Sequence, residues 1–268
     1  MLDDERIVGV ESVSQDGDRL TLRRPPPSPP MSVGASHVRV IEPEPWELGQ
    51  GHRLGGRVNL ALQNEQGNSA KRELDLDLEL DYRRLRDQFE SFGQLEYDTT
   101  RGVRTTDKWR LNNKYSRFFK GSPWYASGWL RLYHDDFADV RLRSLVGPAV
   151  GYKFVEGPAL NLRAEVGPIY LYEDFYQQDD MVAWGPGLLL DDDQSLWNDH
   201  LQRYHRSMGY TSVGVGDPDL WVSWTGLRMP MAWGVVGSLE VEIDYDSEPA
   251  PGTKTTDTTL KLKIGYEW

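Results

Sequence analysis

Two histidines and a serine are the residues whose types best suit hydrolytic chemistry: His200, His205 and Ser207. A serine hydroxyl becomes a nucleophile when a neighbouring imidazole removes its proton. The two histidines are five positions apart, which places them on neither one face of a helix nor one face of a strand. We therefore expect a solvated loop without catalytic residues, and we keep a hydrolase as an alternative.

Three acidic clusters could attract a divalent cation, because carboxylates are oxygen ligands that Ca²⁺ and Mg²⁺ prefer. They are Asp135-Asp136, Asp179-Asp180 and Asp191-Asp192-Asp193. None has the ligand spacing of a known calcium loop, and the chain has no cysteine for a zinc site. We expect solvated acidic loops, no metal and no cofactor. The net charge of -12 also argues against nucleic acid, which requires concentrated Lys and Arg.

The clearest pattern in the chain is an alternation of apolar and acidic side chains. Leu74, Leu76, Leu78, Leu80 and Tyr82 alternate with Glu73, Asp75, Asp77, Glu79 and Asp81. A helix would scatter these charges around its circumference, whereas a strand separates them onto one face. The segment is therefore predicted to be a β-strand with one apolar and one ionic face.

The same period of two continues to the end of the chain. Ten strands are expected at residues 55–63, 73–82, 89–98, 108–120, 124–133, 140–155, 160–172, 220–231, 235–246 and 258–268, and two more within 181–190 and 204–215. Tight turns are expected near 86–87, 121–123, 156–158 and 232–234, and longer loops at 99–107, 173–219 and 246–257. Short turns at one rim and long loops at the other are typical of a closed antiparallel transmembrane β-barrel, here of about 12 strands.

A soluble sandwich or a lipocalin-like barrel also has alternating strands and is the main structural alternative. The membrane is favoured because the ionic faces are charged over long runs and because aromatic residues gather near strand ends, as in interfacial girdles. No apolar run approaches the ~18 residues of a membrane helix. The mean hydropathy of -0.60 is compatible with a barrel, since only alternate residues face lipid.

The end of the chain resembles the signal by which the barrel-assembly machinery recognises outer-membrane proteins. Its residues are Leu260, Leu262, Ile264, Tyr266 and Trp268, which occupy one face and end in an aromatic residue at the terminus itself. Five positions in register at this place predict an assembly signal.

Residues 1–45 are predicted to form a small β-rich module with a Pro-rich linker, and residues 46–268 the barrel. Segments 7–10 and 20–22 flank a turn at 15–18, a proline tract covers 25–30, and 38–41 is a further short strand. A disordered tail is the alternative. Residues 1–30 lack the apolar segment of a signal peptide, as a mature chain also would.

If the apolar faces meet lipid, the ionic faces line the lumen. The expected lining is acidic on the second and third strands, basic on the fourth to seventh, acidic on the penultimate strand and basic on the last. Its residues are Glu73, Asp75, Asp77, Glu79, Asp81, Glu90, Glu96, Lys108, Arg110, Lys114, Arg131, Arg141, Arg143, Arg163, Glu240, Glu242, Asp244, Lys261 and Lys263. In an open pore, opposed walls of unlike charge would filter solutes by size and charge. Ion pairs between neighbouring strands could instead fill so narrow a barrel, and both possibilities remain open.

The barrel region resembles the YdiY-like family, a group of uncharacterised proteins described as salt-induced outer-membrane proteins. The matching motifs, in order, are Gly67-Asn68-Ser69, Lys114-Tyr115-Ser116-Arg117-Phe118-Phe119, Asp136-Phe137 to Arg143, Gly147 to Gly151-Tyr152, Gly167-Pro168-Ile169-Tyr170-Leu171-Tyr172-Glu173, and 244–252 with 256–259. Residues 177–218 depart from the pattern. The resemblance implies an outer-membrane barrel and a link to salt stress, and it brings no catalytic residues.

We therefore expect a porin-like barrel in the outer membrane of a Gram-negative bacterium, with the short turns and the N-terminal module on the periplasmic side. Its expected role is a narrow or plugged channel for small solutes, or envelope maintenance under salt or osmotic stress. The alternatives are a structural barrel that docks a periplasmic protein through residues 1–45, and an outer-membrane lipid hydrolase. Expected partners are outer-membrane lipids and lipopolysaccharide, the barrel-assembly machinery and a periplasmic protein; no enzymatic activity is expected.

Overall fold

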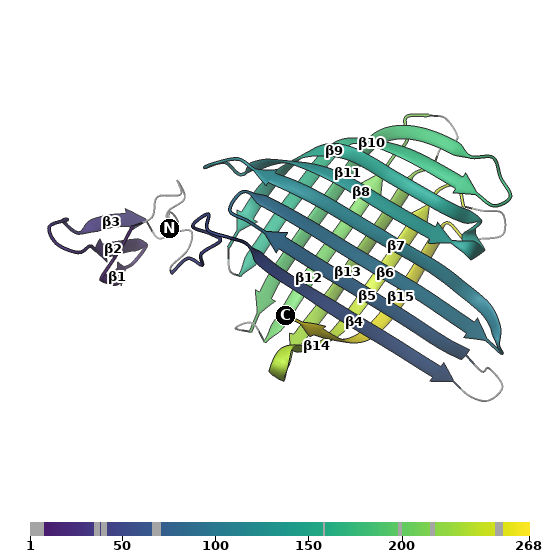
Figure 1. Ribbon diagram of the computed structural model, residues 1–268, viewed down its shortest axis with the longest axis horizontal. Helices are drawn as coiled ribbons and strands as arrows, with labels where there is room; N and C mark the ends of the chain where they lie inside the picture. The colour runs from purple at the N-terminus through teal and green to yellow at the C-terminus, as the bar shows by residue number, and fades with distance from the viewer. Residues whose placement is uncertain are drawn as a thin grey trace.

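In the computed structural model, a small N-terminal sheet is linked to a closed barrel (Figure 1). The structure describes residues 8–34, 38, 42–65, 71–157, 159–197, 200–214, 218–249 and 254–268. The sheet consists of β1 (Ser12–Asp16), β2 (Arg19–Arg23) and β3 (Met31–Gly34). The barrel consists of β4 (Arg53–Glu65), β5 (Lys71–Arg83), β6 (Asp87–Thr100), β7 (Val103–Phe118), β8 (Trp124–Asp135), β9 (Val140–Glu156), β10 (Leu160–Phe175), β11 (Met181–Leu196), β12 (Leu201–Tyr210), β13 (Leu220–Pro230), β14 (Val235–Asp246) and β15 (Thr256–Glu267).

Each barrel strand pairs antiparallel with the next strand along the chain, and β15 pairs with β4 to close the ring. The predicted closed antiparallel barrel of 12 strands is therefore confirmed, including the two strands expected within 181–215. No helix in the described part of the chain is long and apolar enough to cross a membrane.

In the barrel wall, apolar side chains are exposed and charged side chains are buried, the reverse of a soluble protein. On β5, Leu76 and Leu78 are 40% and 44% exposed, whereas Asp77 between them is 2% exposed. On β15, Leu262 is 77% exposed while its neighbour Lys263 is 4% exposed. In water the leucines would be buried and the charges solvated, because enclosing an ion costs far more than exposing a methyl group. The apolar faces therefore meet hydrocarbon and the ionic faces are enclosed, as in a transmembrane barrel.

The two ends of the barrel differ in their connections. The terminal rim, where β4 begins and β15 ends, carries the predicted tight turns, and the opposite loop rim carries the longer connections 211–219 and 247–255. The long loop predicted at 99–107 is wrong. There β6 and β7 extend to a tight turn at Arg101-Gly102, where both residues have positive φ, as a two-residue hairpin turn of this twist requires.

The region 173–219 is not one long loop: it contains β11 and β12, which are longer than or shifted from the two strands expected at 181–190 and 204–215. The acidic triplet Asp191-Asp192-Asp193 belongs to β11 and is not a solvated loop. Asp191 binds lumenal Arg163 at 2.6 Å, while Asp192, on the opposite face of the strand, binds Arg203. Alternating partners on the two faces allow consecutive acids within one strand.

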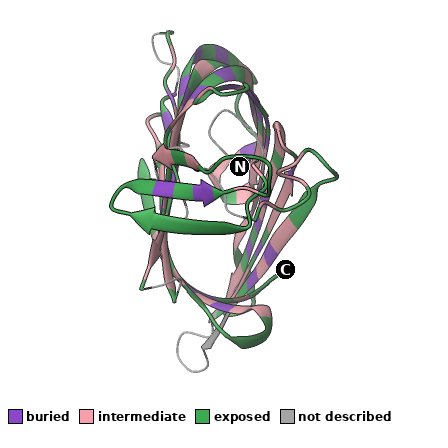
Figure 2. Ribbon diagram, turned by 90° about the vertical axis from the view of Figure 1, so that its left-hand side faces the viewer, coloured by how far each residue is buried: buried purple, intermediate pink, exposed green. Residues whose placement is uncertain are grey.

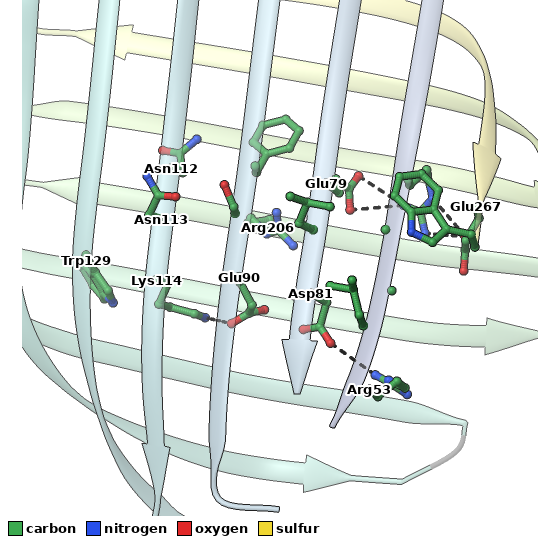
Figure 3. A pocket seen from close by; sticks show the side chains of 18 of the residues that line it. Arg53, Glu79, Asp81, Glu90, Asn112, Asn113, Lys114, Trp129, Arg206 and Glu267 are labelled. Carbon is green, nitrogen blue, oxygen red and sulfur yellow. Dashed lines mark hydrogen bonds and ion pairs between the residues drawn. The ribbon is translucent and has the colours of Figure 1, made fainter. Parts of the chain in front are cut away.

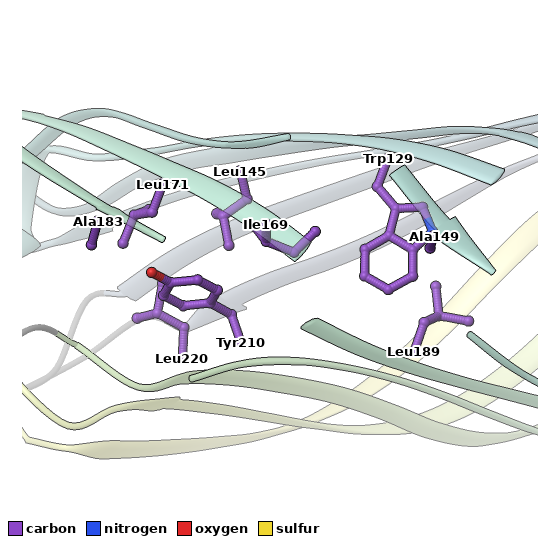
Figure 4. Close-up of a cluster of buried hydrophobic side chains, with 9 residues drawn as sticks. All are labelled: Trp129, Leu145, Ala149, Ile169, Leu171, Ala183, Leu189, Tyr210 and Leu220. Carbon is purple, nitrogen blue, oxygen red and sulfur yellow. The ribbon is translucent and has the colours of Figure 1, made fainter. Parts of the chain in front are cut away.

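Part of the lumen is apolar. Side chains of the consecutive strands β8 to β13 meet in one buried cluster (Figure 4): Trp129, Leu145, Ala149, Ile169, Leu171, Ala183, Leu189, Tyr210 and Leu220. Gly187 of β11 permits this packing, because a Cβ atom there would lie 2.4 Å from Ile169 Cγ1 and 3.1 Å from the Trp129 ring. On this side, protein side chains occupy the lumen.

The ring closes at its shortest ladder. Strands β15 and β4 pair at four positions, from Ile264–Leu60 to Glu267–Arg57, and the backbone of Trp268 exchanges two hydrogen bonds with Gly56. Among described residues, every other pair of neighbouring barrel strands shares at least nine positions. The residues of the predicted assembly signal alternate along the outer face of β15, each about half exposed or more.

The N-terminal sheet lies at the terminal rim, in front of the end of the barrel in Figure 2. The predicted hairpin is present, but its first strand is Ser12–Asp16 and not 7–10, and Met31–Gly34 adds a third strand after the proline tract. Leu20 and Leu22 of β2 are its buried positions. Residue 7 and residues 39–41, which were expected to be in strands, lie outside the described residues.

Candidate functional site

The middle of the lumen is crossed by ion pairs between distant strands. Arg110 of β7, 3% exposed, binds Glu242 at 2.8 Å and Asp244 at 2.9 Å, both on β14. Gln94 of β6 donates a hydrogen bond to Glu242 at 3.0 Å. The Arg110 guanidinium also lies 5.4 Å from the centre of the Trp224 ring on β13. These contacts tie one wall of the barrel to the other and pair the cation with two carboxylates.

Two lysines of β15 complete this central layer. Lys261 binds Glu96 of β6, and it binds Glu242 at 2.9 Å. Lys263 binds Asp77 of β5 at 2.5 Å and Glu240 at 2.7 Å. Since β4 stands between β15 and β5 in the ring, the pair with Asp77 spans the short seam from inside.

Glu165 of β10 forms a second centre, 1% exposed. Its carboxylate accepts hydrogen bonds from Lys114 Nζ (2.9 Å), Tyr125 Oη (2.9 Å), Ser127 Oγ (2.5 Å) and Trp129 Nε1 (2.6 Å). Four donors match the acceptor capacity of an ionised carboxylate. The side chains of β7 and β8 are therefore fixed around one charge on β10.

Nearer the terminal rim the cations again reach across the lumen. Glu79 of β5 forms ion pairs with Arg57 at 3.2 Å and with Arg228 of β13 at 3.4 Å. Arg163 of β10 binds Glu90 of β6 at 2.5 Å. Charged hydrogen bonds and ion pairs thus connect strands at several levels along the barrel axis, and charged hydrogen bonds are stronger than neutral ones.

Cavities remain on both sides of the central layer. One of about 460 Å³ lies against β4 to β7, with Lys114, Glu90 and Asp81 on one side and Trp129 among its apolar residues (Figure 3). A vestibule of about 940 Å³ opens at the terminal rim, and a cavity of about 220 Å³ lies at the loop rim. The central residues Arg110, Glu242 and Lys261 line none of these three cavities.

Most predicted lining residues lie inside the barrel. Those held in lumenal ion pairs are Asp75, Asp77, Glu79, Asp81, Glu90, Glu96, Lys108, Arg110, Lys114, Arg143, Arg163, Glu240, Glu242, Asp244, Lys261 and Lys263. Arg131 lines the loop-rim cavity, and Glu73 stands on the same face of β5 as Asp75. Arg141 differs: it is a half-exposed rim residue bound to Asp174, because a register shift beside Asp174 changes the side to which β9 side chains point.

Several lumenal residues were not predicted. Glu165 and Glu173 share their strand face with Arg163, and so the alternation that located Arg163 could have located them. Phe92, Trp224 and the apolar cluster carry no such signal, because an apolar residue is equally compatible with lipid and with a filled lumen.

The three residues considered for hydrolysis, His200, His205 and Ser207, do not form a hydrogen-bonded group among the described contacts. His205 and Ser207 belong to β12, so the loop expected there is wrong; His200 lies in the turn before it. His205 Nδ1 contacts Thr225 Oγ1 at 2.7 Å, while Ser207 Oγ is buried without a partner among described residues. Of the other acidic pairs, Asp135 caps the short helix Asp136–Ala138, and Asp179-Asp180 lies in the connection before β11.

These observations define the class as a membrane-spanning β-barrel of the outer-membrane type, with an ionic lumen crossed by ion pairs between its own side chains. The chain belongs to the family described as "Protein of unknown function, DUF481", which matches residues 58–268. The predicted YdiY-like membership is thereby confirmed.

Solved structures of similar shape are also barrels. The chain is similar to the NanC porin (10% identity, TM-score 0.43, 80% of this chain and 97% of that chain). It is similar to the β domain of the Bordetella autotransporter BrkA (12%, 0.37, 81% and 98%) and to a porin refined at 1.8 Å resolution (8%, 0.36, 81% and 100%). No curated protein matches the sequence. At these TM-scores the likenesses carry no functional argument.

Proposed function

We propose that the protein is a narrow channel of the Gram-negative outer membrane that its lumenal ion pairs hold closed at rest. The central layer supports this proposal, because Arg110 from β7 and Lys261 from β15 converge on Glu242 while the described cavities lie above and below. A solute larger than water would have to separate these side chains to pass. The short turns and the N-terminal sheet would then face the periplasm.

The resting state is closed because opening breaks buried pairs. Separating one partner from a buried ion pair costs about 3–5 kcal/mol. Because each 1.4 kcal/mol changes a population tenfold, a state with one pair separated would be occupied at roughly 10⁻² to 10⁻⁴. Conduction through the wild-type barrel should therefore be rare and brief.

A response to salt, which the family resemblance implies, would begin at the terminal rim. Glu267, which binds Arg57 at 2.7 Å, has a side chain 47% exposed, whereas Arg110 and Glu242 are each 2% exposed. The Debye length is about 8 Å at physiological ionic strength and shortens as salt is added, so exposed pairs weaken with salt while buried pairs are screened much less. Salt should thus loosen the vestibule before the central layer.

Conductance across planar bilayers tests the proposal. The wild-type barrel should give little current, and the double variant Arg110→Ser/Glu242→Ser, which removes both charges and their bulk, should give frequent openings. The matched control is Arg141→Ser/Asp174→Ser, a pair at the loop rim, which should behave as wild type. Heat-dependent mobility on SDS gels would verify folding of all three. A large steady current through the wild-type barrel would refute the closed state. If the double variant also carries no current, the central layer is not what closes the channel.

A structural barrel is the second candidate. Strand β1 is exposed along its whole length and is an edge of the N-terminal sheet, and such an edge can accept a strand from another protein. We propose a periplasmic protein as that partner, lipids and lipopolysaccharide around the wall, and the assembly machinery at the face from Leu260 to Trp268. Co-purification lost on removal of residues 1–45 would favour this role.

A further inference from the structure

Arg83 is a buried cation without an acidic partner. It ends β5 at the terminal rim, lines the 940 Å³ vestibule and is 8% exposed. Within the described part of the chain no carboxylate oxygen lies within ion-pairing distance of its guanidinium, and Nη1 instead donates to Gln88 Oε1 at 2.7 Å. A neutral amide oxygen compensates a buried charge less well than a carboxylate does.

Gln88 stands where a carboxylate would be expected. Its Oε1 also accepts from Arg163 Nη1 at 3.4 Å, so one neutral oxygen lies between two guanidinium groups. Its Nε2 donates to Asp81, which fixes the direction of the amide. The other face of the site is aromatic: the Phe118 ring lies 4.1 Å from the Arg83 guanidinium and 4.2 Å from Lys153 Nζ. Three cationic side chains of the vestibule, Arg83, Lys153 and Arg163, therefore lie around Gln88 and Phe118.

Six of the seven acids that line the same vestibule form ion pairs with other cations, and the seventh, Glu47, accepts a hydrogen bond from the backbone of Glu44. Glu79 binds Arg57 and Arg228, Glu90 binds Lys114 and Arg163, and Asp191 binds Arg163. Asp81 binds Arg53, Glu156 binds Lys153, and Asp193 lies 3.8 Å from Arg228. Arg83 is left as the lining cation that these pairs do not neutralise.

We propose that the vestibule binds a small oxyanion, a carboxylate or phosphate group of a free solute, between Arg83 and Arg163 beside Gln88. A planar guanidinium presents paired donors that suit such groups, and the cavity has room for a small solute. The open aqueous vestibule favours a free solute over a lipid headgroup as the source. This site is independent of the closed channel, because binding in detergent needs no current.

Thermal unfolding of the full-length barrel in detergent, with inorganic phosphate replacing chloride at constant ionic strength, tests the site. A ligand at ten times its dissociation constant should raise the wild-type midpoint by roughly 3–6 °C and then saturate. The shift should disappear in Arg83→Gln and in Gln88→Glu, whose new carboxylate would occupy the site itself. It should persist in the control Arg53→Gln, a more exposed cation of the same rim.

Three results would overturn the proposal. Absence of a phosphate-specific shift in the wild type would show that the charge binds no oxyanion. A shift that persists in a folded Gln88→Glu would place phosphate elsewhere. A shift with short-chain phosphatidylglycerol but none with inorganic phosphate would assign the site to a lipid headgroup.

Discussion

Replacing Glu165 by glutamine should destabilise the barrel more than any exposed charge neutralisation. The carboxylate is 1% exposed and accepts four hydrogen bonds, one of them from the Lys114 ammonium. Glutamine keeps one acceptor oxygen but turns an amide NH₂ towards donors. At least one donor then lacks a partner, at about 1–3 kcal/mol, and Lys114 loses a charged partner.

Together these losses fall in the range of about 3–5 kcal/mol measured when one member of a buried ion pair is removed. Lys114 keeps Glu90 at 2.9 Å, which favours the lower part of that range. For a chain of this size each kcal/mol lowers the midpoint by about 2–4 °C, so a decrease of about 6–20 °C is expected.

The assay is thermal unfolding in detergent, followed by gel mobility and by tryptophan fluorescence, since Trp129 donates directly to Glu165. The matched control is Glu156→Gln, whose carboxylate is 43% exposed and binds Lys153 at 2.8 Å; it should change stability by less than about 1 kcal/mol. If Glu165→Gln unfolds within 2 °C of wild type, the lumen is wetter and less tightly braced than the contacts indicate.

Three substitutions test other parts of the structure. Gly187→Val should prevent tight packing of Ile169 and Trp129 and cost about 1–3 kcal/mol by urea unfolding; full stability would show that the apolar cluster is loose. Leu262→Arg should cost up to about 2–4 kcal/mol in vesicles if this face meets the bilayer midplane, and no loss would contradict the lipid assignment. Lys263→Met should cost about 3–5 kcal/mol and speed hydrogen exchange at the β15–β4 seam, whereas unchanged exchange would deny it a role in closure.

The strand framework could be predicted wherever the two faces differ in polarity. On β5, leucines alternate with acids, so one register places every charge inside and every leucine outside. Strand β11 shows why other segments were harder. Leu188, Leu189 and Leu190 are consecutive apolar residues, one facing the apolar lumen and its neighbours the lipid, so polarity does not separate the faces.

The sequence predicted which residues line the lumen better than it predicted which of them form ion pairs. Alternation places Arg110 and Glu242 on lumenal faces, but their meeting depends on the distance between opposite walls, which no local pattern encodes. The same limit explains why only pairs between neighbouring strands were considered as the alternative to an open pore, whereas pairs between non-neighbouring strands are prominent. Register shifts are likewise set by the three-dimensional structure and not by local alternation. For this reason Arg141 does not lie on the lumenal face that the alternation predicts.

In the closed channel that we propose, the contacts that hold the fold together are also those that block the lumen. Lipid provides no hydrophobic force to press the walls together, so attraction between the walls must come from within the lumen. Here Lys263 reaches Asp77 and Lys261 reaches Glu96 from the strand whose backbone ladder is shortest. These side chains therefore support ring closure where main-chain bonds are few, while their bulk and pairing fill the centre. In the proposed channel, a pathway through the centre cannot widen without weakening the seam, which would link solute passage to barrel stability in a way that a wide, water-filled pore avoids.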